Sequence, residues 1–349
     1  MSQTVSFYLI VTTMTFKSEE KVERKILSIL KVLSNLQEPA GSRIISKHLK
    51  EHGVELSERG VRYHLRLTDQ RGLTQLVRDR DGRVITEKGL QEIDTALVGD
   101  KVGFAISRIE LLAFRTDFDI ENQCGLIPVN ISFFAESKFA EALRAMKPAF
   151  EKNICVSQMV SVAAAGQRMG NIVVPEGNIG LATVCSIVIN GALLKAGIPM
   201  DSRFGGLLQV RDGKPIRFTQ VIHYNGSSLD PSEIFIKAKM TSVREAALHG
   251  DGEILANFRE VPAICRPIVE KVIEGLNRAG INGVLVIGNT SEPVCEVEVD
   301  LNKIGIILLG GLNPVSAVSE IGFDADNHSM STVMRYSDLV SYKEVLSKY

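Results

Sequence analysis

The stretch at residues 57–86, SERGVRYHLRLTDQRGLTQLVRDRDGRVIT, decides how the N-terminal part of the chain folds. Its first residue, Ser57, is a helix N-cap type, apolar side chains follow at helical spacing, and a glycine ends the pattern. The two short apolar runs behind it, 73–78 and 83–86, are joined through an Asp-Gly turn, which favours a β-hairpin. The stretch therefore predicts a helix of about 57–71 followed by a hairpin.

Two more amphipathic helices precede this stretch, at 18–35 and 43–52, and a closing helix is expected at 88–97. Three short helices followed by a hairpin are the order of a winged helix-turn-helix. We therefore predict such a domain over residues 18–98.

Polar side chains cover one arc of the third helix, and the opposite arc is apolar enough to pack on the first two helices. Arginine and amide groups on a helix in this position can contact phosphates and base edges in the major groove of double-stranded DNA. The alternative is a solvated face with no partner. The predicted DNA-binding residues, including those of the wing, are Ser57, Arg59, Arg62, Tyr63, Arg66, Gln70, Arg78, Arg80 and Arg83.

Composition separates this domain from the rest of the chain. The 349 residues carry a net charge of −1, whereas residues 17–95 contain 16 Lys/Arg and 13 Asp/Glu.

The five cysteines lie far apart, without zinc-ligand spacing, so no metal site is predicted. Residues 1–17 are read as a disordered leader or a start extension, because their apolar run is too short to span a membrane. A cytoplasmic protein is expected.

From residue 99 to residue 349 predicted strands alternate with helices, which favours an α/β or α+β regulatory domain. A repeat offset of about 125 residues suggests an internal duplication, with halves of about 99–230 and 231–349. The alternative is that any α/β protein looks self-similar. Strands are expected at 125–135, 154–165, 181–189, 206–224, 253–258, 283–287, 294–299 and 304–309, and helices at 136–151 and 263–278.

The regulatory domain lacks the common phosphate-loop, metalloprotease and nucleophile-elbow motifs, so neither a catalytic residue nor a cofactor is predicted. Polar residues do gather near several strand ends, and arginine with histidine and hydroxyl groups suits a small carboxylate ligand. Arg203 is the first candidate; the alternative is that these are turn and surface residues. The predicted effector-binding residues are Arg203, Ser202, His223, Asn327, His328, Arg168 and Arg335.

Several long stretches also carry a family resemblance: RTDFDIENQCGLIPVNISFF at 115–134, VPEGNIGLATVCSIVINGALLKAGIP at 174–199 and GINGVLVIGNTSEPV at 280–294. With the winged helix, they resemble the NrpR nitrogen-regulation repressors of methanogenic archaea. The resemblance implies a dimeric transcriptional repressor of nitrogen-assimilation operons, induced by 2-oxoglutarate. Some family members carry two regulatory domains and this chain has room for one, so a second regulatory-domain polypeptide is a possible partner.

Taken together, we expect a homodimer that binds a palindromic operator and is released by 2-oxoglutarate. Two alternatives stay open at this point. One is a regulator of the same architecture that senses another small metabolite, and the other is a metabolic enzyme with a winged-helix appendage.

Overall fold

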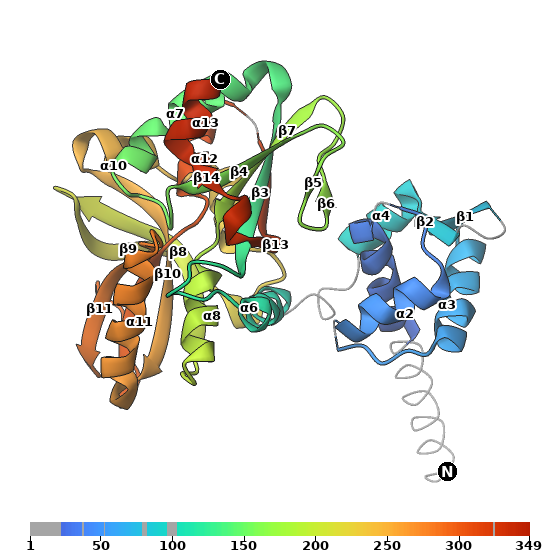
Figure 1. Ribbon diagram of the computed structural model, residues 1–349. Coiled ribbons are helices and arrows are strands. Elements are labelled where there is room, and N and C mark those ends of the chain that lie inside the picture. Colours follow the sequence, from blue (N-terminus) through green and yellow to red (C-terminus); the bar gives the residue numbers. More distant parts are fainter. Residues whose placement is uncertain (1–21, 37, 52, 79–81, 96–102, 324) are drawn as a thin grey trace, which may run out of the picture. The chain divides into compact units, whose positions relative to one another are not determined.

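The computed structural model describes residues 22–36, 38–51, 53–78, 82–95, 103–323 and 325–349. The chain divides into two compact units, Met1–Lys101 and Val102–Tyr349 (Figure 1). The expected leader at 1–17 and the expected boundary at residue 98 lie outside the described residues. Among the helices that are described, none is both long enough and apolar enough to cross a membrane.

The smaller unit has the predicted winged helix-turn-helix order. Its elements are the helical residues 22–36, α2 (Ser42–Glu51), α3 (Glu58–Gln70), β1 (Thr74–Arg78), β2 (Gly82–Ile85) and α4 (Glu87–Thr95). Helix α3 starts at the expected cap, where the Ser57 hydroxyl accepts a hydrogen bond from the Gly60 N–H at 3.2 Å. Strands β1 and β2 pair antiparallel as the wing.

Helix α3 is held by its apolar face. Val61 and Leu65 are fully buried, and they join Ile29, Ile45 and Leu49 of the two preceding helices in one core cluster. Because these side chains fix which face of α3 points inward, the polar arc on the opposite side of the helix must point outward.

The larger unit contains two five-stranded sheets in which every described pairing is antiparallel, with the strand orders β11-β12-β10-β8-β9 and β13-β3-β7-β4-β14. Strands and helices alternate along the chain, which confirms the predicted mixture of helices and sheets. Because both sheets are antiparallel, the class is α+β. The strands are β3 (Leu126–Ala135), β4 (Met159–Ala164), β5 (Arg168–Met169), β6 (Ile172–Val173), β7 (Asn178–Val184), β8 (Asp201–Arg211), β9 (Lys214–His223), β10 (Gly252–Pro262), β11 (Val284–Thr290), β12 (Lys303–Leu309), β13 (Asp326–Arg335) and β14 (Val340–Ser341). The helices are α6 (Phe104–Arg115), α7 (Phe139–Glu151), α8 (Ile187–Lys195), α9 (Pro231–Lys237), α10 (Val243–His249), α11 (Arg266–Arg278), α12 (Asn313–Ser319) and α13 (Tyr342–Lys348).

The element order of this unit occurs twice. The series β3-α7-β4-β7-α8-β8 is repeated as β10-α11-β11-β12-α12-β13, with each element about 125 residues further along. The two sheets repeat the order as well, since β4-β7-β3-β13 corresponds to β11-β12-β10-β8. The last strand of each repeat therefore lies in the sheet of the other repeat, so halves cut near residue 230 do not each contain one sheet.

The helices are also shared between the repeats. Helix α7 contacts α12, and α8 contacts α11, so each contact joins the first helix of one repeat to the second helix of the other (Figure 1). One core cluster combines Ile131 of β3 with Ile306 of β12, and a second combines Leu181 of β7 with Leu207 of β8. The two sheets therefore share their hydrophobic cores.

Two predicted strands are wrong. The strand expected at 181–189 ends at Val184, and Ile187 begins the buried helix α8. Its residues IVINGALLK are apolar on nearly every face of the helix. They therefore lack the alternation of apolar and polar positions by which a helix is distinguished from a strand in sequence. The strand expected at 294–299 is a turn, because Cys295 and Glu296 adopt positive φ values of 47° and 62°.

Candidate nucleic-acid interface and a buried cavity

The outward face of α3 carries the side chains predicted from sequence. Arg59, Arg62, Tyr63, Arg66 and Gln70 are all exposed. Within the described part of the chain, none of the three guanidinium groups takes part in an ion pair or an internal hydrogen bond. These positive groups are thus available to phosphates and to guanine edges.

A polar cluster fixes α3 against the wing. The Asp69 carboxylate accepts hydrogen bonds from the Thr74 hydroxyl at 2.6 Å and from Arg83 Nε at 2.7 Å. Arg83 is therefore half-buried, and its Nε links the wing to α3. Of the other predicted wing arginines, Arg80 and the side chain of Arg78 lie outside the described residues.

His64 lies at the edge of the polar arc and is buried. Burial, followed by the charge of Lys25, lowers the pKa of its imidazole. Its ring packs edge-on against Tyr63, with the ring centroids 5.2 Å apart. The residue packs the helix and supports the exposed phenol.

The predicted effector residues are spread over β5, β8, β9 and β13 of the larger unit. Ser202 is buried and its hydroxyl accepts a hydrogen bond from Asn190 Nδ2, whereas His223 is exposed at the end of β9. His328 is half exposed and paired with Asp326 at 3.0 Å, which raises the pKa of the histidine. The other positions are separate: Asn327 near the start of β13, Arg335 at its far end and Arg168 on the β5–β6 hairpin.

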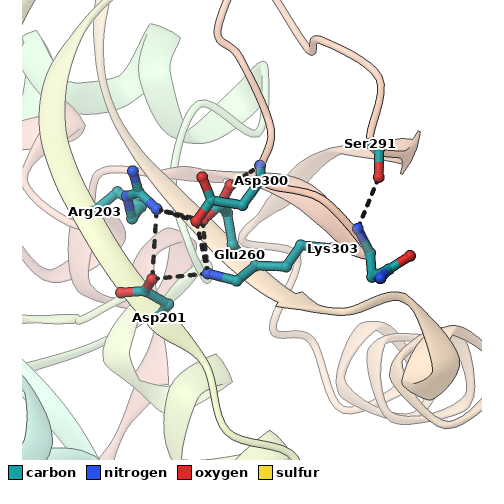
Figure 2. A network of polar contacts seen from close by, with 7 residues as sticks. Asp201, Arg203, Glu260, Ser291, Asp300 and Lys303 are labelled. Atoms are coloured by element: carbon teal, nitrogen blue, oxygen red, sulfur yellow. Dashed lines mark hydrogen bonds and ion pairs between the residues drawn. The ribbon is translucent and has the colours of Figure 1, made fainter.

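Arg203 is occupied by an ionic network (Figure 2). Its Nη1 lies 2.7 Å from Glu260 Oε2 and 2.8 Å from Asp300 Oδ2, and Lys303 reaches the same two carboxylates at 3.2 and 3.0 Å. Asp201, Glu260 and Asp300 lie close enough to share a cation. Two side-chain cations already compensate them, so Arg203 holds β8, β10 and the loop before β12 together.

A small cavity does lie where the two repeats meet. Asn130 of β3 and Asn257 of β10 face it from the two sheets, and the segments leading into α8 and α12 line it at matching positions of the repeats. Its lining consists of Ile109, Asn130, Cys185, Ser186, Ile187, Tyr224, Asp230, Ser232, Asn257, Arg259, Gly311, Leu312, Ser329 and Met330. None of the seven predicted effector residues is among them, although Tyr224 and Ser329 directly follow two of those residues in the sequence.

Arg259 is the charged centre of this cavity. It is 1 % exposed, and its Nε and Nη1 atoms have no hydrogen-bond partner. The guanidinium carbon lies over the Tyr224 ring, 4.7 Å from its centroid. Tyr224 donates its own hydroxyl proton to Asn257 Oδ1, and Asn257 Nδ2 donates to Ser186 Oγ at 3.3 Å.

Backbone irregularities lie beside the cavity in both sheets. The pairing of β10 with β8 shifts register between Phe258 and Arg259, and the pairing of β13 with β3 shifts between His328 and Thr332. Within the second shift Met330 adopts φ = 46°, an uncommon conformation for a residue other than glycine. Such bulges re-aim side chains and are frequent beside functional sites.

Sequence reasoning missed Arg259 because it follows directly on the predicted strand 253–258. The available signal was an arginine within the largely apolar run ILANFREVP at 254–262, beside Asn257 and Glu260. Such a residue on a buried strand must face either a partner or a cavity.

Comparison with known proteins gives consistent matches. Residues 102–341 match the family described as NrpR regulatory domains NRD1 and 2, and residues 27–93 match the ribonuclease R winged-helix domain. The chain is 36 % identical to the global nitrogen regulator NrpRI of Methanosarcina mazei, over 92 % of this chain and 98 % of that protein. It is 31 % identical to the global nitrogen regulator NrpR of Methanocaldococcus jannaschii, over 93 % of this chain and 56 % of that protein.

A solved structure is similar as well. The crystal structure of a nitrogen repressor-like protein from Methanococcus jannaschii superposes with a TM-score of 0.58 at 27 % identity. The match covers 68 % of this chain and 98 % of that one.

Proposed function

Because the chain belongs to the NrpR family of nitrogen regulators, we propose that it is a DNA-binding transcriptional repressor of nitrogen-assimilation genes. The relatives are named as regulators, and this chain is a regulatory protein rather than an enzyme. The proposal comprises a cytoplasmic homodimer, a palindromic operator and release by 2-oxoglutarate.

The unpaired arginine face of α3 is the observation that carries the proposal. The apolar face and the polar cluster at Asp69 hold α3 with its arginine face outward, which supports its use as a recognition helix. In a symmetric dimer, two such helices enter successive major grooves about one helical turn apart. Base-edge contacts from Arg62 and its neighbours would then select the sequence.

Release of DNA requires a second conformational state. A ligand shifts an equilibrium only when it binds one state more tightly than the other. 2-Oxoglutarate must therefore bind better to the state in which the two α3 helices do not fit the operator. The effector would act on the larger unit, which holds the cavity at Arg259.

Operator titration tests the DNA-binding part. A duplex is selected by the wild-type protein from a random-sequence pool, and its binding is followed by fluorescence anisotropy at fixed salt. We expect Arg62→Ala to weaken binding by about 1–3 kcal/mol with an unchanged Tm. The matched control is Arg71→Ala, since Arg71 is paired with Glu23 at 2.8 Å and lies off the polar arc; unchanged operator affinity for Arg62→Ala contradicts the assignment.

Adding 2-oxoglutarate to the same complex tests the effector part. Millimolar 2-oxoglutarate should release the duplex from the wild-type protein. If the complex persists until a second regulatory polypeptide is added, this chain is the DNA-binding subunit and the sensor is the partner.

A further inference from the structure

We propose that two copies of this chain form their dimer through one end of the larger unit, where Ile264, Ile268 and Leu301 make an exposed apolar group, here called the end patch. The inference rests on the proposed function, because it supplies the contact surface of the homodimer named there. Neither the family match nor the names of the relatives assign such a surface.

The end patch contains the two most exposed of the large apolar side chains that the structure describes. Ile264 is 90 % exposed, Leu301 is 81 % exposed and Ile268 is 49 % exposed. A hydrogen bond of 2.9 Å from the Ala263 N–H to the Asn302 carbonyl continues the pairing of β10 with β12, so Ile264 and Leu301 lie side by side. Single exposed apolar residues are ordinary, whereas a contiguous group of them marks an interaction site.

The first repeat provides an internal comparison. The hydrogen bond between Ala263 and Asn302 has a counterpart from the Glu136 N–H to the Gly177 carbonyl at 3.1 Å, and both acceptor residues have positive φ values. The residues at the matching positions of the first repeat are exposed and polar: Ser137 corresponds to Ile264, Glu141 to Ile268 and Glu176 to Leu301. Because the same backbone tolerates polar residues there, the fold itself does not require the end patch.

The loop that carries Leu301 is held in place by hydrogen bonds on both sides (Figure 2). Glu260 Oε1 accepts a hydrogen bond from the Asp300 N–H at 2.8 Å. The Ser291 hydroxyl accepts one from the Asn302 N–H, also at 2.8 Å. An apolar side chain on a backbone fixed in this way loses little conformational freedom when a partner covers it.

Charges of both signs border the end patch, which suits contact with a second copy. Asp201 and Asp300 are exposed there. Arg203 and Lys303, which pair with both of them, are partly exposed. Across a two-fold axis the same surface meets itself, so each positive group can face a negative group of the other copy. Because the matching end of the first repeat is polar, the contact uses one surface of each copy and closes as a dimer instead of continuing into a chain.

The exposed side of α11 extends this surface. Ile268, Lys271 and Glu274 follow one another there at intervals of about one turn, and all three are exposed. A two-fold axis perpendicular to α11 would bring Lys271 of one copy toward Glu274 of the other. A stable dimer buries about 800 Å² on each partner, which is more than three side chains supply, and a helix about 20 Å long extends the contact toward that size.

Exchange of the end patch for the residues of the first repeat tests the inference with the full-length protein. The double variant is Ile264→Ser with Leu301→Glu, which copies the residues that the same backbone carries at Ser137 and Glu176. The matched control is Phe114→Ser, which removes the next most exposed large apolar side chain from α6. Analytical ultracentrifugation measures the dimer dissociation constant of each protein, and circular dichroism compares their folds.

We expect the wild-type protein to sediment at twice its mass of 38.2 kDa. The double variant should raise the dissociation constant about 100-fold while its circular-dichroism spectrum stays that of the wild type. Phe114→Ser should leave the constant unchanged. A monomeric wild-type protein, a double variant that dimerises as tightly as the wild type, or loss of the dimer in Phe114→Ser instead overturns the inference.

Hydroxyl-radical labelling of the wild-type protein is a second measurement that needs no variant. Ile264 and Leu301 should be labelled several-fold less at protein concentrations above the dissociation constant than below it, and equal labelling contradicts the inference. Operator titration separates this surface from the proposed function. If the double variant stays dimeric and binds the operator as the wild type does, the proposed function stands and this surface falls. If the double variant becomes monomeric but the wild-type dimer binds no DNA, this surface stands and the proposed function falls.

Discussion

Replacing Asp230 with asparagine should stabilise the larger unit at neutral pH. Asp230 is 9 % exposed, and burial, with the neighbouring charge of Glu233, raises the pKa of its carboxyl from 3.8 to about 6. Because the folded state prefers the protonated form, it binds more protons than the unfolded state between pH 4 and pH 6. The unfolding free energy therefore falls as the pH rises through this window and stays low above it.

The size of the effect follows from the two pKa values. A rise of the Asp230 pKa from 3.8 to about 6 lowers the unfolding free energy at pH 7.5 by about 3 kcal/mol. This value is the upper limit of the stability that Asp230→Asn regains. Asparagine keeps the cap of α9, because its side-chain oxygen can accept the same hydrogen bond from the Ser232 N–H. Near pH 4 the variant and the wild type should be nearly equal.

Urea denaturation of the full-length chain at pH 4, 5, 6 and 7.5, followed by circular dichroism, measures this difference. Asp300→Asn is a control of opposite sign, since hydrogen bonds from Lys303 and Arg203 lower the pKa of the Asp300 carboxyl. A difference between Asp230→Asn and wild type that stays constant with pH, or a variant less stable at pH 7.5, refutes the reasoning.

Two further substitutions probe the positioning of the two candidate sites. Asp69→Asn should lower the stability of the winged helix by about 1 kcal/mol and weaken operator binding, because it loosens Arg83 in the wing. A circular-dichroism melt measures the stability, and the anisotropy titration measures the operator affinity. Gly311→Ala should destabilise the larger unit by about 1–3 kcal/mol, because the alanine Cβ would lie 2.4 Å from Nδ2 of the buried Asn130 on β3. Gly226→Ala, where a Cβ meets nothing within 4 Å, is the control for the urea titration, and equal effects of the two glycine variants contradict the crowding argument.

The winged helix was predictable because its signals are local. The cap at Ser57, the apolar period of α3 and the Asp-Gly turn each act within a few residues, and the structure shows the cap, the helix and the hairpin there. Helix α8 was missed because a helix buried on all sides has no period that reports its type.

The cavity was not predictable because its walls come from segments far apart in the chain. Arg203 has the chemistry expected of a carboxylate site, but the alternation of strand β8 points it to the ionic network. Ser202, its neighbour and another predicted residue, pairs with Arg259 across the sheet, but Arg259 itself was not predicted. Only the pairing of β8 with β10, which sequence patterns do not specify, brings Arg259 to the cavity.

The exchange of end strands also determines how the larger unit can fold during synthesis. Strand β3 leaves the ribosome early, yet its partner β13 lies about 200 residues further along, as in the hydrogen bond from the Ile131 N–H to Ser331. Until β13 has been translated, one edge of the first sheet stays open to pairing with other chains. A ribosome that stalls before residue 326 would release a chain with that edge exposed, and long-range pairing of this kind is slow.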